Sequence, residues 1–256
     1  MSISLQGKKG LVIGIANESS IAWGCAKAFH AAGAELAITY LNDKAEPFVR
    51  PLAERLQAPI ILPLDVQNEQ QIQHVFEEIQ TQWGHIDFLL HSIAFAPKDD
   101  LSHRVVDSSR EGFLKAMDIS CYSFIRLCHY AEPLMKAWGS FLTVSYYGAE
   151  KVIPHYNLMG PVKAALEGTV KYLAAELGQK KIRVNAISPN PLFTRAASGI
   201  PDFNTLLESA RLHAPEHELA TLEEVGAFAA FLVSHPAKHI TGNICFIDAG
   251  LHLLGD

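Results

Sequence analysis

Short apolar runs of strand length alternate along this chain with longer segments in which apolar residues recur every three or four positions. Most of the short runs are continuous and rich in β-branched residues, which is typical of strands covered on both faces. The predicted strands are Gly10–Gly14, Glu35–Tyr40, Pro59–Leu64, Ile86–His91, Ser140–Tyr146, Ile182–Ile187 and Asn243–Asp248. This alternation predicts an α/β fold of the Rossmann type, with a doubly wound, seven-stranded parallel sheet and helices on both faces.

The helical pattern is clear after residue 68, where apolar residues spaced 3 and 4 apart form one face of a helix. These residues are Ile72, Val75, Phe76, Ile79 and Trp83. Asn68 directly before the run, with Gln71 three residues later, predicts a capping box at the start of the helix. No linker, repeat or low-complexity segment interrupts the alternation, so we expect residues 1–256 to form a single domain.

Composition narrows the class of protein. Hydrophobic residues make up 49% of the 256 residues, which is enough for a large core and argues against disorder. Lys and Arg total 21 against 27 Asp and Glu, so the net charge of -6 argues against a nucleic-acid partner. No apolar run is long enough to cross a membrane, and the N-terminus lacks the apolar segment of a signal peptide.

The four cysteines, Cys25, Cys121, Cys128 and Cys245, contain no Cys-x-x-Cys pair. A disulfide framework and a zinc site are therefore not expected. Buried thiols in a reducing cytoplasm are the favoured interpretation, and no bound metal is predicted.

The first predicted strand ends at a turn, residues 14–24, that precedes a helix. In dinucleotide-binding folds this turn binds a pyrophosphate through free backbone amides and the positive end of the helix. Gly14 permits a tight turn, Ser20 is expected to cap the helix and offer a hydroxyl, and Gly24 allows close helix packing. The usual G-x-G-x-x-G spelling is absent, so an ordinary strand–helix turn remains the alternative.

Two further strand ends carry candidate binding residues. Asp65 and Val66 follow the third strand, where the carboxylate suits an adenine amino group but equally suits a helix cap. The segment 92–96 follows the fourth strand, and its small residues allow a flat ring to pass close to the backbone. Plain packing is the alternative for that segment.

The most informative pair is Tyr156 and Lys163. Pro154 is typical of a first helical turn, so a helix starting there would place the two side chains two turns apart, on one side. The ammonium would then steady developing phenolate character on the tyrosine and could hold a ribose hydroxyl. Pro161 lies between them and predicts a local kink. A surface tyrosine and a surface lysine remain the alternative.

Tyr147 and Lys151 form a competing pair with the Tyr-x-x-x-Lys spacing of many nicotinamide reductases. Both precede Pro154, so they are expected to lie in a loop, where a four-residue spacing does not align side chains. We therefore expect this pair not to be the catalytic one.

Many short segments, in order along the chain, match one known sequence pattern. They are Gly14, Ser20–Ile21, Thr39–Tyr40, Asn42–Lys44, Asp65–Val66, Ser92–Ile93, Phe95–Pro97, Glu111–Phe113, Asp118–Ser120, Ile153–Pro154, Tyr156–Asn157, Met159–Gly160, Arg183–Ser188, Pro191 and Ala196–Ile200. On these segments the chain resembles the divergent branch of the short-chain dehydrogenase/reductases. Within that branch, from about Leu5 to Gly250, it is most similar to the bacterial NADH-dependent enoyl-[acyl-carrier-protein] reductases.

This resemblance implies an NADH-dependent reduction of trans-2-enoyl thioesters in fatty acid elongation, on substrates carried by acyl carrier protein. It implies that Tyr156 donates a hydrogen bond to the developing enolate oxygen, that Lys163 holds the nicotinamide ribose, and that Tyr146 lines the substrate side. It also implies a substrate contact at Ala96, a substrate-binding loop with helices at about 190–215, and a cytoplasmic homotetramer. The implied cofactor contacts are Gly14, Ser20, Ile21, Asp65, Val66, Ile93, Lys163, Leu192, Phe193, Thr194, Arg195 and Ala196.

The chain departs from the family pattern at several positions, so two alternatives stay open: a reductase of another carbonyl or activated alkene, and an NAD-binding protein without turnover. The departures are Leu41, Pro189, Asn190, the segment His217–Ala220 and Ala249.

Two charge patterns complete the expectations. The segment Tyr40–Asp43 offers no cation for a 2′-phosphate until Lys44, which predicts NADH rather than NADPH. The segment Pro201–Thr205, where relatives carry cations that dock the acidic carrier, has none. Weak electrostatic dependence on the carrier is therefore expected, with Arg195 and Arg211 as flanking substitutes.

Overall fold

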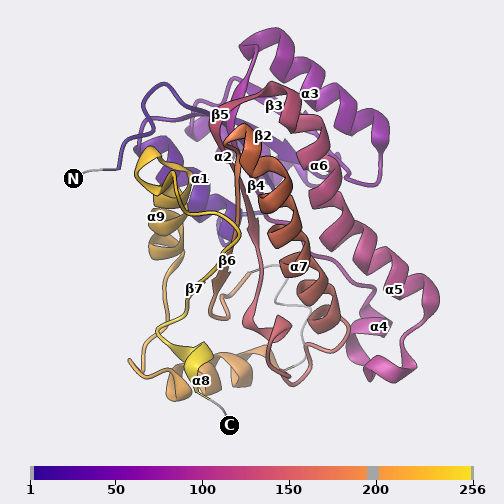
Figure 1. The fold of residues 1–256 in the computed structure, drawn as a ribbon. Helices are drawn as coiled ribbons and strands as arrows, with labels where there is room; N and C mark the ends of the chain where they lie inside the picture. Colours follow the sequence, from indigo (N-terminus) through magenta and orange to yellow (C-terminus); the bar gives the residue numbers. More distant parts are fainter. Residues whose placement is uncertain (1–2, 195–201, 255–256) are drawn as a thin grey trace.

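The computed structural model describes residues 3–194 and 202–254, and in these residues one parallel sheet forms the centre of the fold (Figure 1). Its seven strands follow the order β3-β2-β1-β4-β5-β6-β7. The bounds are β1 Lys9–Ile13, β2 Glu35–Tyr40, β3 Ile60–Pro63, β4 Ile86–His91, β5 Met135–Val144, β6 Arg183–Pro189 and β7 Ile244–Ile247. The predicted α/β fold with a seven-stranded parallel sheet is confirmed.

The predicted strand bounds agree closely for β2 and β4 and differ most for β5. That strand begins at Met135, five residues earlier than the apolar run from Ser140 indicates. Its first four residues are exposed or half-exposed. The register between β4 and β5 is irregular here, because Ile86 pairs with Met135 while Phe88 pairs with Ser140. A hydrophobic pattern detects only the buried part of such a strand.

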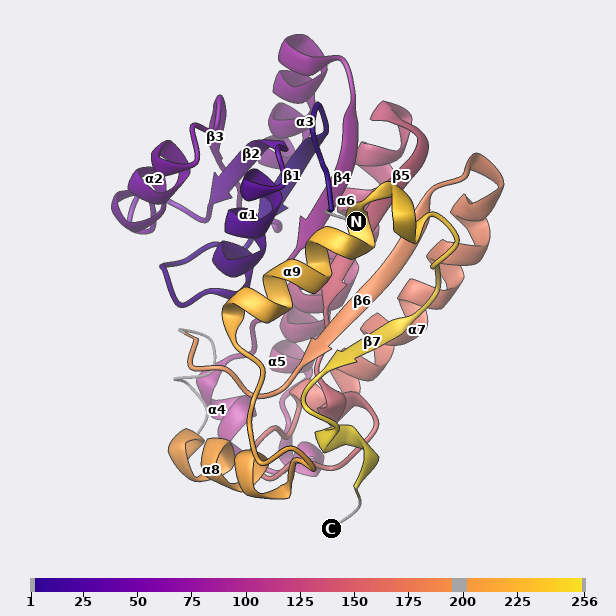
Figure 2. The same cartoon turned by 90° about the vertical axis from the view of Figure 1, so that its left-hand side faces the viewer.

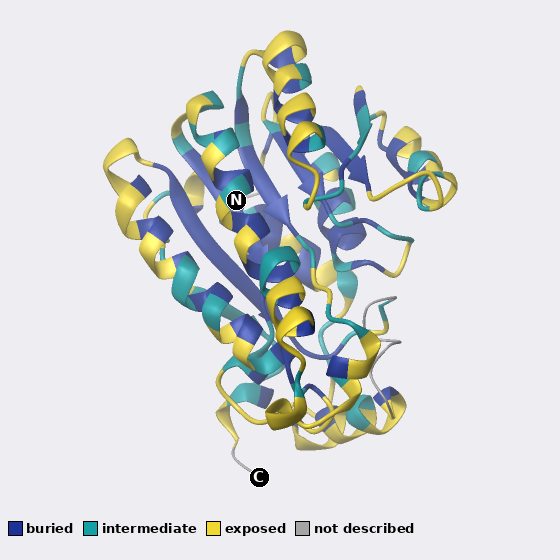
Figure 3. Cartoon of the chain, turned by 90° about the vertical axis from the view of Figure 1, so that its right-hand side faces the viewer, coloured by how far each residue is buried: buried dark blue, intermediate teal, exposed yellow. Residues whose placement is uncertain are grey.

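Helices cover both faces of the sheet (Figure 2). On one face lie α1 Ile21–Ala31, α2 Glu46–Arg55 and α9 Leu222–Val233; on the other lie α3 Glu69–Trp83, α6 Ser123–Ala131 and α7 Met159–Leu177. Successive strand residues alternate between the layers, so Val12 packs with the first set and Leu11 and Ile13 pack with the second. Figure 3 shows the result, with buried strands between helices whose outer faces are exposed.

Helices α1 and α9 pack closely because each has a glycine at the contact. A Cβ on Gly24 would lie 2.7 Å from the carbonyl oxygen of Leu222, and one on Gly226 would lie 2.4 Å from the oxygen of Gly24. The close helix packing expected at Gly24 is therefore present, and the helix that packs against α1 at this point is α9.

The start of α3 confirms one half of the predicted capping box. The Asn68 side chain accepts hydrogen bonds from the backbone N–H groups of Gln70 and Gln71. The side chain of Gln71 turns instead to the end of β3, where its Oε1 accepts from the N–H of Asp65 at 2.6 Å. The reciprocal half of the predicted capping box was wrong, because the Gln71 side chain accepts from the N–H of Asp65 instead of from the N–H of Asn68.

The remaining helices, α4 Lys98–Ser102, α5 Arg110–Met117 and α8 Phe203–His213, gather near the carboxyl ends of the strands, with a π-helical turn at Asp118–Tyr122 after α5 (Figure 2). The sheet order reverses between β1 and β4, so a crevice for a ligand is expected at this end. Across residues 3–194 and 202–254, no helix is long and apolar enough to span a membrane. No cluster of three potential metal ligands occurs in the same part of the chain.

Candidate active site

The turn after β1 brings two strand ends together at the crevice. Gly14 has a φ of 111°, and a Cβ there would lie 2.1 Å from the carbonyl oxygen of Ser92 at the end of β4. Only glycine suits both the backbone angle and the contact. The close approach of the two strand ends places this turn directly before the N-terminus of α1, where a phosphate-binding turn would lie.

Ser20 does not cap α1 as expected. Its hydroxyl accepts from the N–H groups of Ala16 and Asn17 at 3.0 and 3.1 Å. Ser20 is buried and precedes the helix, but its side chain stabilises the turn rather than the helix end. The sequence therefore locates the start of α1 correctly at Ser20, but the Ser20 hydroxyl binds N–H groups of the preceding turn and not those of the helix.

Asp65 lies at the carboxyl end of β3, and the cap of the following helix is Asn68. One carboxylate oxygen of Asp65 accepts from the N–H of Gln67 at 3.0 Å. The helix-cap alternative for Asp65 was therefore wrong, and the adenine contact stays a proposal. Val66 and Ile93 are half-buried against the core beneath α3 and α6.

A cavity of about 380 Å³ opens at the same end of the sheet. Of the residues implied as cofactor or substrate contacts, it is lined by Ile21, Ala96, Tyr146, Tyr156, Lys163, Leu192 and Thr194. Gly14, Ser20, Asp65, Val66, Ile93 and Phe193 are not among its lining residues. Arg195 and Ala196 lie outside the described residues. The cavity thus unites the proposed catalytic side chains with part of the loop after β6.

Tyr156 reaches this cavity from a turn rather than from a helix. Helix α7 begins at Met159, so the expected helix start at Pro154 was wrong. His155 and Asn157, on either side of Tyr156, have φ values of 64° and 40°, which an α-helix excludes. Pro161 is the third residue of α7, where no intrahelical hydrogen bond is lost, so the reason for a kink disappears.

Tyr146 and Tyr156 pack edge to face, with ring centroids 4.8 Å apart. The Tyr146 hydroxyl is buried without a hydrogen-bond partner in the described part of the chain. Burial raises the pKa of both phenols, and the negative charge of Glu167 raises the pKa of Tyr156 further. Both tyrosines are therefore neutral hydrogen-bond donors at physiological pH. Burial and Glu167 disfavour a full phenolate on Tyr156 in the resting protein. That Lys163 steadies phenolate charge developing on Tyr156 during the reaction stays a prediction.

Lys163 lies one turn into α7 and is only 4% exposed. Its Nζ donates to the carbonyl oxygen of Val144, at the end of β5, at 2.6 Å. Burial lowers the pKa of this ammonium to about 8. The surface alternative for the pair is excluded, because Tyr156 and Lys163 are both buried and line the same cavity.

Glu167 is a buried residue of this region that the sequence reasoning missed. Its carboxylate accepts a hydrogen bond of 2.6 Å from the hydroxyl of Ser145, directly after the carbonyl that Lys163 holds. Burial raises the pKa of Glu167, while the Ser145 hydroxyl lowers it in part. The available signal was its position four residues after Lys163, on the same helical face.

Asn190, one of the departures from the family pattern, anchors the loop after β6. Its side chain donates to the carbonyl oxygen of Pro191 and accepts from the N–H of Ala220, at 2.9 and 2.7 Å. The side chain is 2% exposed, so these bonds hold the loop against the segment before α9. Ala249, another departure, has a φ of 54°, which explains the glycine that the family carries there.

The competing pair Tyr147 and Lys151 does not enter this cavity. Tyr147 begins a short 3₁₀ turn, Tyr147–Ala149, and Lys151 is exposed just beyond it. Both residues line a different cavity beneath α8.

Comparison with known proteins agrees with this geometry. The family model described as enoyl-(acyl carrier protein) reductase matches residues 14–252. The chain belongs to this family. It is 49% identical over 251 residues to an enoyl-[acyl-carrier-protein] reductase [NADH] of Rickettsia felis, covering 98% of this chain and 96% of the relative.

Solved members of the enoyl-(acyl carrier protein) reductase family share the fold. The reductase of Anaplasma phagocytophilum, solved in complex with NAD, superposes with a TM-score of 0.95 at 48% identity, covering 98% of this chain and 96% of that one. The reductase of Bacillus cereus, solved with NADP+ and indole naphthyridinone, has a TM-score of 0.96 at 45% identity and covers 100% of both chains.

Proposed function

We propose that this chain reduces the trans-2 double bond of enoyl thioesters with NADH, in fatty acid elongation on acyl carrier protein. The observation that carries the proposal is the single cavity in which the neutral donors Tyr146 and Tyr156 meet the buried cation of Lys163. Membership of the enoyl-(acyl carrier protein) reductase family, by a match over residues 14–252, supports the same reaction.

The residues at the strand ends suit a dinucleotide. Gly14 lets the turn approach Ser92 closely just before α1, and the first N–H groups of α1 would face a pyrophosphate there. Asp65 would accept from the adenine amino group, and Lys163 would hold the nicotinamide ribose in the cavity that Ile21, Leu192 and Thr194 also line. When bound, the reduced nicotinamide supplies a hydride to the β-carbon of the substrate.

Tyr156 would then act on the charge that the hydride creates. Negative charge collects on the thioester oxygen as an enolate, and the neutral phenol of Tyr156 donates a hydrogen bond to it. Tyr146 packs against the Tyr156 ring and offers a second buried hydroxyl toward the substrate side. Ala96 lines the same cavity as the two tyrosines, and its small side chain leaves space for the substrate that a larger side chain would fill.

The reaction is tested by following NADH oxidation with crotonyl-CoA or dodecenoyl-CoA as substrate. We expect oxidation that depends on the enoyl thioester and yields the saturated acyl thioester. Turnover with ketones or aldehydes but not with enoyl thioesters would favour the alternative carbonyl reductase. NADH binding without turnover on any of these substrates would favour a non-catalytic NAD-binding protein.

The family resemblance also supports a homotetramer in the cytoplasm as part of this proposal. Apolar side chains stand exposed on neighbouring helices of one face, where a partner copy would bury them. These are Leu114 on α5, Tyr122, Ile125 on α6 and Tyr172 on α7. The thiols of Cys25, Cys121 and Cys128 are buried and free, which suits a reducing compartment.

The preference between NADH and NADPH also depends on Arg50, a cation near the end of β2 that the segment Tyr40–Lys44 does not include. Arg50 of α2 lies over the ring of Tyr40 at the end of β2, with its guanidinium carbon 5.8 Å from the ring centroid. Its guanidinium is paired with Glu46 at 2.6 Å. We expect NADH to be preferred because this cation is already engaged, although the Bacillus cereus relative was solved with NADP+.

Glu46→Gln should therefore raise kcat/KM for NADPH by about fivefold, because it frees Arg50 for a 2′-phosphate. The values for NADH should stay unchanged. Glu54→Gln is the matched control, since Glu54 is an exposed acid of the same helix without an ion pair in the described residues. Equal use of NADH and NADPH by the unmodified protein would contradict the preference.

A further inference from the structure

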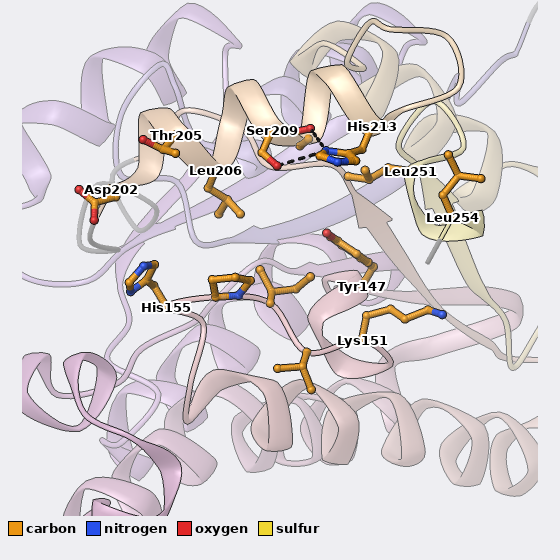
Figure 4. A pocket seen from close by; sticks show the side chains of 14 residues that line it. Tyr147, Lys151, His155, Asp202, Thr205, Leu206, Ser209, His213, Leu251 and Leu254 are labelled. Atoms are coloured by element: carbon orange, nitrogen blue, oxygen red, sulfur yellow. Dashed lines mark hydrogen bonds between the residues drawn. The ribbon is translucent and has the colours of Figure 1, made fainter. Parts of the chain in front are cut away.

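A second cavity, of about 330 Å³, lies between α8 and the segment that precedes α7. We call it the α8 groove. Figure 4 shows Thr205, Leu206, Ser209 and His213 of α8 on one side, and Tyr147, Lys151 and His155 on the other. Leu251 and Leu254 border one end of the groove.

Leu206 separates the α8 groove from the catalytic cavity. Its side chain lines both cavities. It also packs against the hydrophobic cluster that contains Tyr146, Tyr147 and Tyr156. A molecule bound in the groove would therefore lie one leucine side chain away from the proposed hydrogen-bond donor.

The walls of the groove differ in chemistry from the catalytic cavity. Thr205 and Ser209 of α8 and the apolar residues Ile153 and Pro154 all line the groove. The Ser209 hydroxyl lies 3.2 Å from Nδ1 of His213 (Figure 4). Lys151, His155 and His213 add basic groups, and Asp202 is the carboxylate among the described lining residues. A hydrocarbon chain would give no partner to the Thr205 hydroxyl, the His155 ring or the Lys151 ammonium. A chain that alternates amides, a hydroxyl and methyl groups, and that ends in a phosphate, suits them better.

Two cations lie near α8, Arg211 and Lys151, and they differ in whether a carboxylate already pairs with them. Arg211 of α8 is ion-paired with Glu208 at 2.6 Å, so it is a poor substitute for the cations missing from Asp202–Thr205. Lys151 forms no ion pair with any residue that the structure describes. An exposed ammonium at the rim of the groove is the group expected to meet a phosphate.

We propose that the α8 groove binds the phosphopantetheine arm of the thioester substrate, with Lys151 at its phosphate and Leu206 at the entrance to the catalytic cavity. The inference rests on the proposed function and names how its substrate is held. Acyl carrier protein and CoA carry the same arm, so either form of substrate would use the groove.

The test compares three thioesters that share the crotonyl group: the CoA thioester, the 4′-phosphopantetheine thioester and the N-acetylcysteamine thioester. The last lacks both the phosphate and the pantoyl-β-alanyl part of the arm. Lys151→Ala should raise KM for the two phosphate-bearing substrates about threefold to fivefold, the effect of one exposed ion pair, with kcat unchanged. KM for the N-acetylcysteamine thioester and for NADH should not change. Lys151→Glu should act in the same direction and more strongly.

Lys136→Ala is the matched control, because Lys136 is an exposed lysine near the amino end of β5, away from both cavities. An equal effect of Lys151→Ala on all three thioesters, or none on any, would overturn the inference. So would a KM effect that follows acyl length in N-acetylcysteamine thioesters, which would assign the groove to the acyl tail. Failure of the unmodified protein to reduce any of the three would instead contradict the proposed function.

Discussion

Tyr156→Phe is expected to lower kcat about 100-fold while leaving the affinity for NADH unchanged. The substitution removes only the hydroxyl, so the buried ring and its edge-to-face contact with Tyr146 remain. Because burial and Glu167 raise the pKa of this phenol, it donates as a neutral group and interacts most strongly once the substrate oxygen is charged. The lost hydrogen bond therefore affects the transition state more than the bound cofactor.

Steady-state kinetics with crotonyl-CoA, together with a direct NADH titration, measure the two quantities separately. Tyr130→Phe is the matched control, since it makes the same change in a tyrosine of α6 that lines neither cavity. Its kcat should remain close to that of the unmodified protein. An unchanged kcat in Tyr156→Phe, with a large loss in Tyr146→Phe, would transfer the donor role to Tyr146.

Lys163→Ala is expected to weaken NADH binding about 10-fold to 100-fold and to lower kcat as well. The ammonium is buried and held by the carbonyl of Val144, so its charge is aimed at the cavity before a cofactor arrives. Its removal takes away a ground-state contact with the ribose, which Tyr156→Phe does not. Equal NADH affinity in Lys163→Ala and the unmodified protein would contradict this role.

The pH dependence provides an independent check of the same residue. Lys163 has a pKa of about 8, below the ordinary 10.5, because burial disfavours its charged form. The protein therefore loses this charge as pH rises through about 8, and NADH affinity should fall there. His91 does not contribute to this change, because burial lowers its pKa to about 3 and it stays neutral.

Whereas NADH affinity should fall as the pH rises above about 8, the free energy of unfolding should rise. Below pH 8 the folded protein bears the full cost of the buried ammonium, and the cost disappears between about pH 8 and 10.5. The contribution of Lys163 to the free energy of unfolding therefore rises by about 3 kcal/mol across that window. Comparing denaturant unfolding of the unmodified protein and Lys163→Ala isolates this term, since the variant lacks the titrating group.

The sequence by itself determined the sheet and much of the site. Largely apolar runs of strand length such as Glu35–Tyr40 and Ile86–His91 are typical of strands covered on both faces, and the structure has them as β2 and β4. The family pattern singled out Tyr146, Tyr156 and Lys163, and these line one cavity. The strands were predictable because a local hydrophobic pattern specifies them. The three site residues were predictable because they belong to sequence motifs that the chain shares with its family.

The tertiary structure alone decided how these side chains are held. Pro154 favours a helix start, but Asn157 donates to the carbonyl of Leu101 at 2.8 Å, and Tyr156 lies in a turn before α7. Ser145 and Glu167 are far apart in sequence and meet only because α7 packs against the end of β5. The helix preference of a single residue contributes less free energy than such contacts, because each contact gives a buried or half-buried polar group a partner in place of water.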